Sequence, residues 1–415
     1  MIIVNGGVTA PQGFLASGIR AGIKKSGNPD LALLYSETPA VAAGVFTTNA
    51  FKASPVKLSI ANLRNKTHRA IVVNSGNANC ANGMQGDADA LAMAGYIAKG
   101  MALGKSEILV ASTGIIGHKF PLRKIEQKAP ELISSLSVKG GSDLAEAIMT
   151  TDTVKKEIAV KVKLGGKIVK IGGAAKGGGM LHPIMKKAGR PTRMMAGRHA
   201  TMLGFITTDV AISKAMLERA LADAADESFN MISVDGDMST NDSLFIMANC
   251  LAGNKMITQA GKDYQVFLEA LRGLCISLAK MLAADGEGET KLVEIKVLGA
   301  KTDESAKIIA RKISTSNLLK CALFGEDPNW GRVAASAGSA GVDFDPGSTD
   351  IYLGPAKVLS GGSSMKTFDK EKVRKYIKGK EVFIKVDLKS GKGSATAWTC
   401  DFLKEYVTIN SEYST

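Results

Sequence analysis

The sequence has few cysteines and histidines, and their spacing does not match the common metal and redox motifs. Five cysteines are scattered over 415 residues without a CxxC pair, so neither a zinc ribbon nor a dithiol redox site is indicated. The four histidines show no HExxH or related spacing. We therefore expect free thiols in a reducing compartment, no metal and no resident cofactor.

Aromatic residues make up only 5% of the chain, and no apolar run approaches the ~20 residues that a helix needs to cross a bilayer. The start, MIIVNGGVTAPQG, lacks the basic and apolar segments of a secretory signal. The net charge is +14, but the lysines and arginines are spread without a recognition-helix pattern. We expect a cytoplasmic protein without nucleic-acid or membrane partners. A basic nucleic-acid-binding protein is the non-enzymatic alternative, and a steep salt dependence of affinity would be its signature.

Apolar periodicity alternates between strand and helix along the chain. Strands are expected at 68–76, 106–117, 243–250, 291–300 and 405–410, and helices at 87–103, 142–151, 213–232, 262–286 and 304–325. Hairpins are expected at 155–173, where Gly165-Gly166 joins two alternating runs, and at 381–402. Strands, hairpins and helices together predict a mixed α/β fold rather than a purely parallel sheet.

The glycine-rich stretch from Ile171 to Asp209 is the strongest chemical signal. It reads IGGAAKGGGMLHPIM, then a basic interruption, then ATMLGFITTD. A threonine hydroxyl becomes a useful nucleophile when its own α-amine acts as base, which requires that the preceding peptide bond be cut. The unperturbed α-amine has a pKa of about 7.7–8.0. The hypothesis is self-cleavage between Ala200 and Thr201; from these residues alone, a turn leading into a buried helix is the alternative.

Other irregular polar blocks occur in a fixed order along the whole chain: AGVFTTNAFKASPV, VVNSGNANCANGMQG, ASTGIIG, MTTDT, ADGEGETK, LFGEDPNWGR and YVTINSEYST. Together they resemble the ornithine acetyltransferase (glutamate N-acetyltransferase) family. The resemblance implies an acyltransferase of arginine biosynthesis that moves acetyl from N-acetylornithine to glutamate, releasing ornithine and N-acetylglutamate, through an O-acetyl-Thr201 intermediate. It leaves open whether acetyl-CoA is a further co-substrate.

The resemblance also implies a fold and an assembly. The fold is the α/β sandwich of self-processing enzymes with an N-terminal nucleophile, shared by ornithine acetyltransferases and aminopeptidases. The precursor would give fragments 1–200 and 201–415, interleaved and paired as an α2β2 heterotetramer. A self-processing amidase or aminopeptidase that uses the same threonine is the alternative function, with water resolving the acyl-enzyme.

The family pattern assigns site residues by position. Thr113 and Gly114 match the oxyanion hole, and Thr201 the nucleophile. Glu287 matches an active-site glutamate that binds the substrate amine, whereas Glu289 nearby carries little weight. The substrate-contacting positions are Thr150 (with Thr151 or Thr153 as the other registers), Lys176, Thr201, Glu287, Asn410 and Thr415.

Two segments depart from simple expectations. KKAGRPTRMMAGRH, residues 186–199, separates HPIM from ATML, which nearly adjoin in the family, and is expected to be an exposed basic loop whose presence bears on the cleavage rate. SVDGDMSTND resembles a calcium loop, but Thr240 stands where the sharp turn needs glycine, so an acidic turn is expected.

Overall fold

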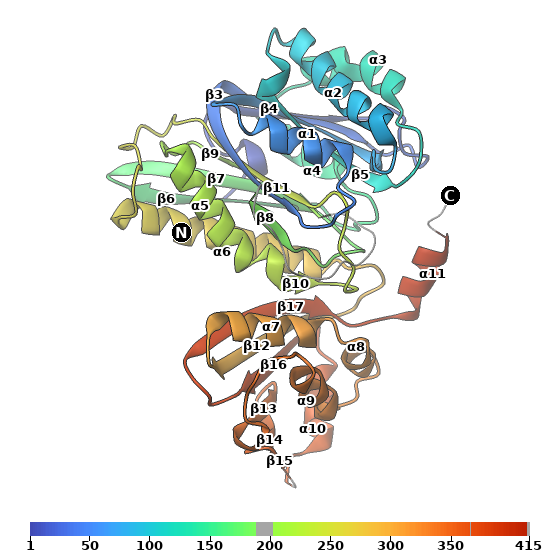
Figure 1. Ribbon diagram of the computed structural model, residues 1–415, viewed down its shortest axis with the longest axis vertical. Coiled ribbons are helices and arrows are strands. Elements are labelled where there is room, and N and C mark those ends of the chain that lie inside the picture. The colour runs from blue at the N-terminus through green and yellow to red at the C-terminus, as the bar shows by residue number, and fades with distance from the viewer. Residues whose placement is uncertain (188–201, 366, 413–415) are drawn as a thin grey trace. The chain divides into compact units, whose positions relative to one another are not determined.

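The computed structural model describes residues 1–187, 202–365 and 367–412, and the chain divides into two compact units. Unit 1 contains Met1–Asp226 and Asp237–Leu278, and unit 2 contains Glu227–Gly236 and Ala279–Thr415. Figure 1 shows the elements of both. The expected cleavage junction falls inside unit 1, so unit 1 draws on both expected fragments.

Unit 1 is built on a ten-stranded mixed sheet with the order β1-β6-β7-β9-β11-β3-β4-β5, and β2 and β8 also pair with β3. Its strands are β1 (Ile2–Val4), β2 (Phe14–Ile19), β3 (Leu31–Thr47), β4 (His68–Asn77), β5 (Ile108–Ile115), β6 (Lys156–Leu164), β7 (Lys167–Lys176), β8 (Met185–Lys187), β9 (Leu203–Thr208) and β11 (Ser243–Ala248). The long β3 pairs with β2 and β4 through its first half and with β11 through its second half. It therefore joins the two halves of the sheet.

Helices cover unit 1 because several of its strands are buried on both faces. Ile71 and Val73 of β4 belong to one apolar cluster, while Ala70 and Val72 belong to another. Such strands read as continuous apolar runs, as AIVV does. The helices are α1 (Ser54–Asn62), α2 (Gly83–Gly100), α3 (Leu122–Ser134), α4 (Gly141–Ala147), α5 (Lys214–Asp226) and, as far as Leu278, α6 (Lys262–Ala283), with 3-10 turns at Gly7–Thr9 and Lys105–Glu107. Figure 1 shows α2 and α3 outside β4 and β5.

Unit 2 contains a seven-stranded sheet with the order β10-β17-β12-β16-β13-β14-β15. Its strands are β10 (Ile232–Ser233), β12 (Leu292–Ala300), β13 (Asp350–Leu353), β14 (Ala356–Ser360), β15 (Ser363–Ser364), β16 (Glu381–Asp387) and β17 (Gly393–Cys400). Its helices are α7 (Asp303–Ser314), α8 (Asn317–Phe324), α9 (Trp330–Gly338), α10 (Lys370–Ile377) and α11 (Lys404–Glu412), with 3-10 turns at Phe229–Met231 and Pro346–Ser348. Within the described residues of either unit, no helix is long and apolar enough to cross a membrane.

The mixed α/β prediction is confirmed, and so is the first hairpin. Strands β6 and β7 pair antiparallel from Lys156 opposite Ala175 to Leu164 opposite Lys167. Gly165 and Gly166 make the turn with φ of 50° and 85°, a region that glycine occupies without strain.

Three element predictions are wrong. The predicted second hairpin does not form, because β12 lies between β16 and β17 and pairs with both. The helix predicted at 304–325 is two helices, since the Ser316 hydroxyl accepts the Leu319 N–H and begins α8. The predicted terminal strand at 405–410 is helix α11. The centroid of its Tyr406 ring lies 4.5 Å from that of Phe402, with the two rings tilted by 39°. No described strand pairs with the helix.

The predicted basic loop at 186–199 starts later than expected. Lys186 and Lys187 belong to β8, which pairs antiparallel with β3, and Lys187 forms an ion pair with Glu218 at 2.5 Å. Residues 188–199 lie outside the described part of the chain.

Candidate active site

Three of the predicted site residues meet in unit 1. Lys176 is the last residue of β7, Thr113 lies near the end of β5, and Thr150 follows α4. The Lys176 ammonium donates to the Thr150 hydroxyl at 2.7 Å and to the Thr113 hydroxyl at 3.3 Å. Lys176 and Thr113 are both buried, each with 2% of its surface exposed. Thr113 and Thr150, which lie 63 and 26 positions before Lys176 in the sequence, thus both accept a hydrogen bond from its ammonium.

A buried aspartate that the sequence analysis missed supports this cluster. Asp152 accepts the Lys156 ammonium at 2.7 Å, the Gly177 N–H at 2.7 Å and the Thr150 N–H at 3.0 Å. Its carboxylate also lies 3.9 Å from the Lys176 ammonium. Burial by itself would raise the pKa of Asp152, but the two lysines outweigh it and lower the pKa to about 2. The MTTDT motif contains Asp152, so its proximity to Thr150 was the available signal.

Gly114 occupies a backbone position that requires glycine. Its φ is 128°, and a Cβ there would lie 2.3 Å from the Gly76 carbonyl carbon. Strand β5 can therefore approach β4 this closely only with glycine at position 114. This contact fixes the backbone immediately after Thr113.

Ala200 and Thr201 lie outside the described residues, but the residues that follow them lie beside the Lys176 cluster. Leu203 stands opposite Lys176 in the antiparallel β7–β9 register. The Met202 N–H donates to Asp242 at 2.8 Å, and Asn241 donates to the Ser112 carbonyl at 2.8 Å. Asn241 and Asp242 thus link the residue before Thr113 to the residue after Thr201. They end the SVDGDMSTND segment, which the sequence analysis treated only as an acidic turn.

Two further predicted residues meet in unit 2. Asn410 of α11 donates to the Glu287 carboxylate at 2.7 Å. Gly288 allows this approach, because its φ is 69° and a Cβ there would lie 2.8 Å from the Tyr406 nitrogen. Thr415 lies outside the described residues. Partial burial raises the pKa of the neighbouring Glu289 to about 8, and one of its carboxylate oxygens has no described partner.

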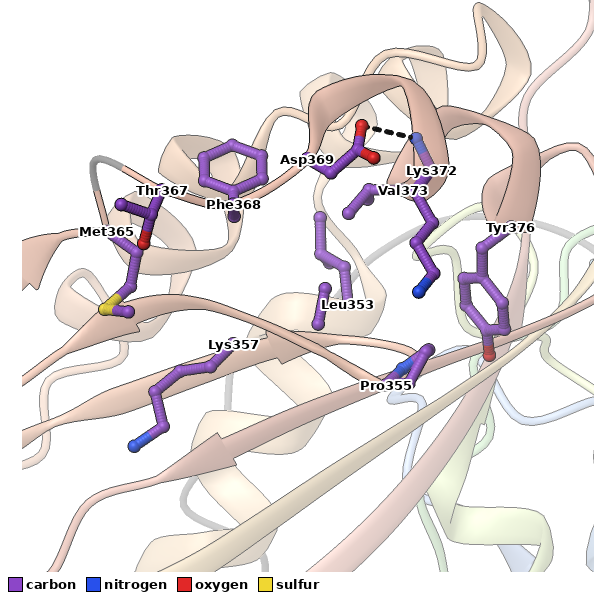
Figure 2. A pocket seen from close by; sticks show the side chains of 11 residues that line it. Leu353, Pro355, Lys357, Met365, Thr367, Phe368, Asp369, Lys372, Val373 and Tyr376 are labelled. Atoms are coloured by element: carbon purple, nitrogen blue, oxygen red, sulfur yellow. Dashed lines mark hydrogen bonds between the residues drawn. The ribbon is translucent and has the colours of Figure 1, made fainter.

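Unit 2 also has a pocket of about 300 Å³ between the β13–β14 hairpin and α10, shown in Figure 2. Apolar side chains such as Leu353, Phe368 and Val373 line it, with Lys372 at one side. No predicted site residue that the structure describes lines this pocket. It is therefore separate from both clusters of site residues.

Comparison with known proteins identifies full-length relatives. A family model described as the ArgJ family matches residues 15–415. The arginine biosynthesis bifunctional protein ArgJ of Dehalococcoides mccartyi is 49% identical over 416 residues, covering 100% of this chain and 98% of the relative. The protein of the same name from Symbiobacterium thermophilum is 46% identical over 412 residues, covering 99% of each.

Among solved structures, the Bacillus halodurans arginine biosynthesis bifunctional protein is 40% identical, with a TM-score of 0.48, over 49% of this chain and 96% of that one. The Mycobacterium tuberculosis ornithine acetyltransferase complexed with ornithine is also 40% identical, with a TM-score of 0.42, over 44% of this chain and 98% of that one.

Proposed function

The chain belongs to the ArgJ family, and we propose that it moves the acetyl group of N-acetylornithine to glutamate through an ester on Thr201. It is an acyltransferase of arginine biosynthesis. The observation that carries the proposed site is that Thr113 and Thr150 both bond to Lys176 at the end of β7. Lys176 stands opposite Leu203, which follows the expected nucleophile by two residues. Ornithine and N-acetylglutamate are the proposed products.

In the first half-reaction, the Thr201 hydroxyl oxygen attacks the acetyl carbonyl carbon while the Thr201 α-amine takes the hydroxyl proton. The oxyanion that forms is stabilised by the Thr113 hydroxyl and the Gly114 N–H. Because Thr113 already accepts a bond from Lys176, its own hydroxyl proton is left to point at the oxyanion. The C–N bond then breaks, the proton passes to the leaving nitrogen, and ornithine departs.

In the second half-reaction, the glutamate amine attacks the ester carbonyl and the Thr201 α-amine takes a proton from the attacking nitrogen. The ester C–O bond then breaks as that proton passes to the leaving Thr201 oxygen. The positive charge of Lys176 disfavours protonation of the nearby α-amine and so keeps it available as a base. Glu287 and Asn410 are proposed to hold the substrate amine, and Thr150 and Thr415 to contact the substrate. The α-amine exists only after the bond between Ala200 and Thr201 is cut.

The first test is the intact mass and N-terminal sequence of freshly purified protein, followed by a transfer assay. We expect two pieces of 200 and 215 residues, the second beginning Thr-Met-Leu-Gly. Without glutamate, ornithine release from N-acetylornithine should stop after about one equivalent per Thr201, and continued release should require glutamate.

Thr201→Ala should stay uncut and inactive, whereas Thr258→Ala, an exposed threonine of unit 1, should be cut and active. An uncut wild-type chain that still transfers acetyl would overturn the proposed nucleophile. An uncut, inactive chain would mean that the 186–199 segment blocks processing.

The curated relatives are named as bifunctional, and we propose a second activity in which acetyl-CoA acetylates glutamate at the same threonine. The required groups all belong to the protein, so no resident cofactor is proposed. Release of free CoA thiol from acetyl-CoA and glutamate, absent in Thr201→Ala, is the expected result. Continued thiol release without glutamate, beyond the single turnover that acetylates Thr201, would indicate hydrolysis instead.

The amidase or aminopeptidase alternative is not favoured, because relatives named for arginine biosynthesis match the full chain. Acyl transfer to water at a rate independent of glutamate would favour it. We further propose that the two fragments stay paired as an α2β2 assembly in the cytoplasm.

A further inference from the structure

Lys24 lies against the backbone that forms the proposed oxyanion hole, although no sequence motif marked it. A Cβ added at Gly76 would lie 3.2 Å from Lys24 Cγ, so the lysine stem packs directly on Gly76. Gly76 in turn touches Gly114, as described above. The side chain therefore runs along the outer side of the Gly76–Gly114 contact.

The Lys24 ammonium is held near the turn that leads to Thr150. It donates to the Pro29 carbonyl at 2.6 Å and, at 3.5 Å, to the carbonyl of Ala147, the last residue of α4. Among the described residues these two carbonyls are its hydrogen-bond acceptors, and an ammonium has three N–H donors. Its side chain is only partly buried.

Asp30 fixes the loop that presents Lys24. The buried Asp30 carboxylate accepts the backbone N–H groups of Ala21, Ile23 and Lys24. A lysine on a loop held by three such bonds loses less conformational freedom on binding a ligand than one on a free loop. The position is preorganised for a ligand anion.

Lys176 is less suited to bind a substrate anion. Two of its donors are bonded to Thr113 and Thr150, and Asp152 at 3.9 Å offsets its charge. The buried cluster of Lys156, Asp152 and Lys176 holds two cations and one carboxylate. Lys24 also has two acceptors among the described residues, but it is only partly buried, so its third N–H can reach a ligand.

We propose that Lys24 is a substrate-binding residue whose ammonium pairs with the α-carboxylate that N-acetylornithine and glutamate share. The inference rests on the proposed function and adds a residue to its site. One cation serves both half-reactions, because the two substrates differ in their side chains and in the acetylation of the α-nitrogen but share the α-carboxylate.

The charges around Lys24 make the pairing pH-dependent. Burial lowers the pKa of Lys24 to about 8; Lys176 on β7 lowers it further, whereas Asp30, Asp152 and Glu146 on α4 raise it. Lys124 on α3 also lies close, donating to the Gly22 carbonyl. Lys24 is thus mostly protonated at neutral pH, and it loses its charge as the pH rises through about 8. Substrate affinity should fall over the same range.

The test compares Lys24→Met, which keeps the stem on Gly76 but removes the charge, with Lys24→Arg, which keeps the charge. Lys25→Met is the matched control on the next residue. For N-acetylornithine we expect Lys24→Met to raise KM about tenfold with kcat little changed, as for loss of a charged binding contact. Arginine should restore much of the affinity, and all variants should be cut as the wild type is.

Two further readouts separate binding from a structural role. With N-acetylornithine α-amide, the wild type and Lys24→Met should have equal KM, because the amide removes the partner charge. The wild-type KM should rise between about pH 7 and about pH 9, whereas the KM of Lys24→Arg should not. A lowered kcat at unchanged KM, or equal discrimination between acid and amide by both proteins, would overturn the proposal. A wild type without transfer activity would instead refute the proposed function.

Discussion

At the scale of single residues, the proposed site in unit 1 combines buried charges with the threonines. Asp152 neutralises part of the charge of two lysines and also holds the backbone of Thr150 and Gly177. Charges are buried at acceptable cost only when they are paired and hydrogen-bonded. Asp152 therefore lowers the cost of burying the Lys176 ammonium next to Thr113 of the proposed oxyanion hole.

We expect Asp152→Asn to destabilise the fold by about 3–5 kcal/mol at neutral pH, because two buried lysines lose their partner charge. The folded pKa of Asp152, about 2, lies below its ordinary value, so its contribution is present at neutral pH and is lost as the pH falls towards 2. Denaturant unfolding at neutral and acidic pH measures both effects.

The control for Asp152 is Asp87→Asn, because Asp87 forms an exposed ion pair with Lys57 at 3.6 Å. That change should cost about 0–1 kcal/mol. A difference between Asp152→Asn and the wild type that stays constant from pH 7 down to about pH 2 would contradict the assignment of the effect to ionised Asp152.

At the scale of elements, helix α11 positions a predicted site residue that the sequence had placed on a strand. The helix buries none of its own residues, yet it lies over the Gly288 backbone and carries Asn410 to Glu287. The position of α11 therefore depends on a few contacts. One of them is with the Gly288 backbone, which a side chain at that position would prevent.

Gly288→Ala should displace α11, because its Cβ would lie 2.8 Å from the Tyr406 nitrogen and the φ of 69° disfavours alanine. We expect KM for N-acetylornithine to rise about tenfold and proteolysis within α11 to accelerate, since misplaced binding groups lose affinity. Gly253→Ala is the control, with φ of 68° and no atom within 4 Å. Equal effects of the two changes would show that backbone strain alone, and not the position of α11, is responsible.

At the scale of the whole molecule, the expected fragments share one sheet. Strand β9 follows the junction, lies between β7 and β11, and has all six of its residues buried. On the far side of β11 lies β3, which belongs to the expected first fragment. Cutting between residues 200 and 201 leaves these strand pairings intact.

The two fragments should therefore co-elute under native conditions and separate only in denaturant. Light scattering should give twice the 43.4 kDa of one chain for the proposed α2β2 assembly. Uncut Thr201→Ala should elute at the same volume. Fragments that separate without denaturant would contradict the shared sheet, and a mass equal to one chain would contradict the assembly alone.

The sequence by itself determined the alternation of strands and helices, the first hairpin and the family. Local patterns were sufficient, because apolar periodicity and a Gly-Gly turn are properties of neighbouring residues. It also placed Thr113, Thr150 and Lys176 in short motifs that the structure brings together, as it does Glu287 and Asn410. These roles remain predictions until the variants are measured.

Tertiary structure alone decided which strands pair and which charges are buried. Strand β12 enters between β16 and β17 because nonlocal pairing overrides the hairpin pattern, and α11 forms where strand propensity had no partner strand. Lys24 was missed because one of its acceptors, the Ala147 carbonyl, lies 123 positions away, and no spacing rule reports such a contact. Asp152 stands in the MTTDT motif, but its burial against Lys156 and Gly177 depends on the fold. Burial and charge at one point in space are properties of the fold.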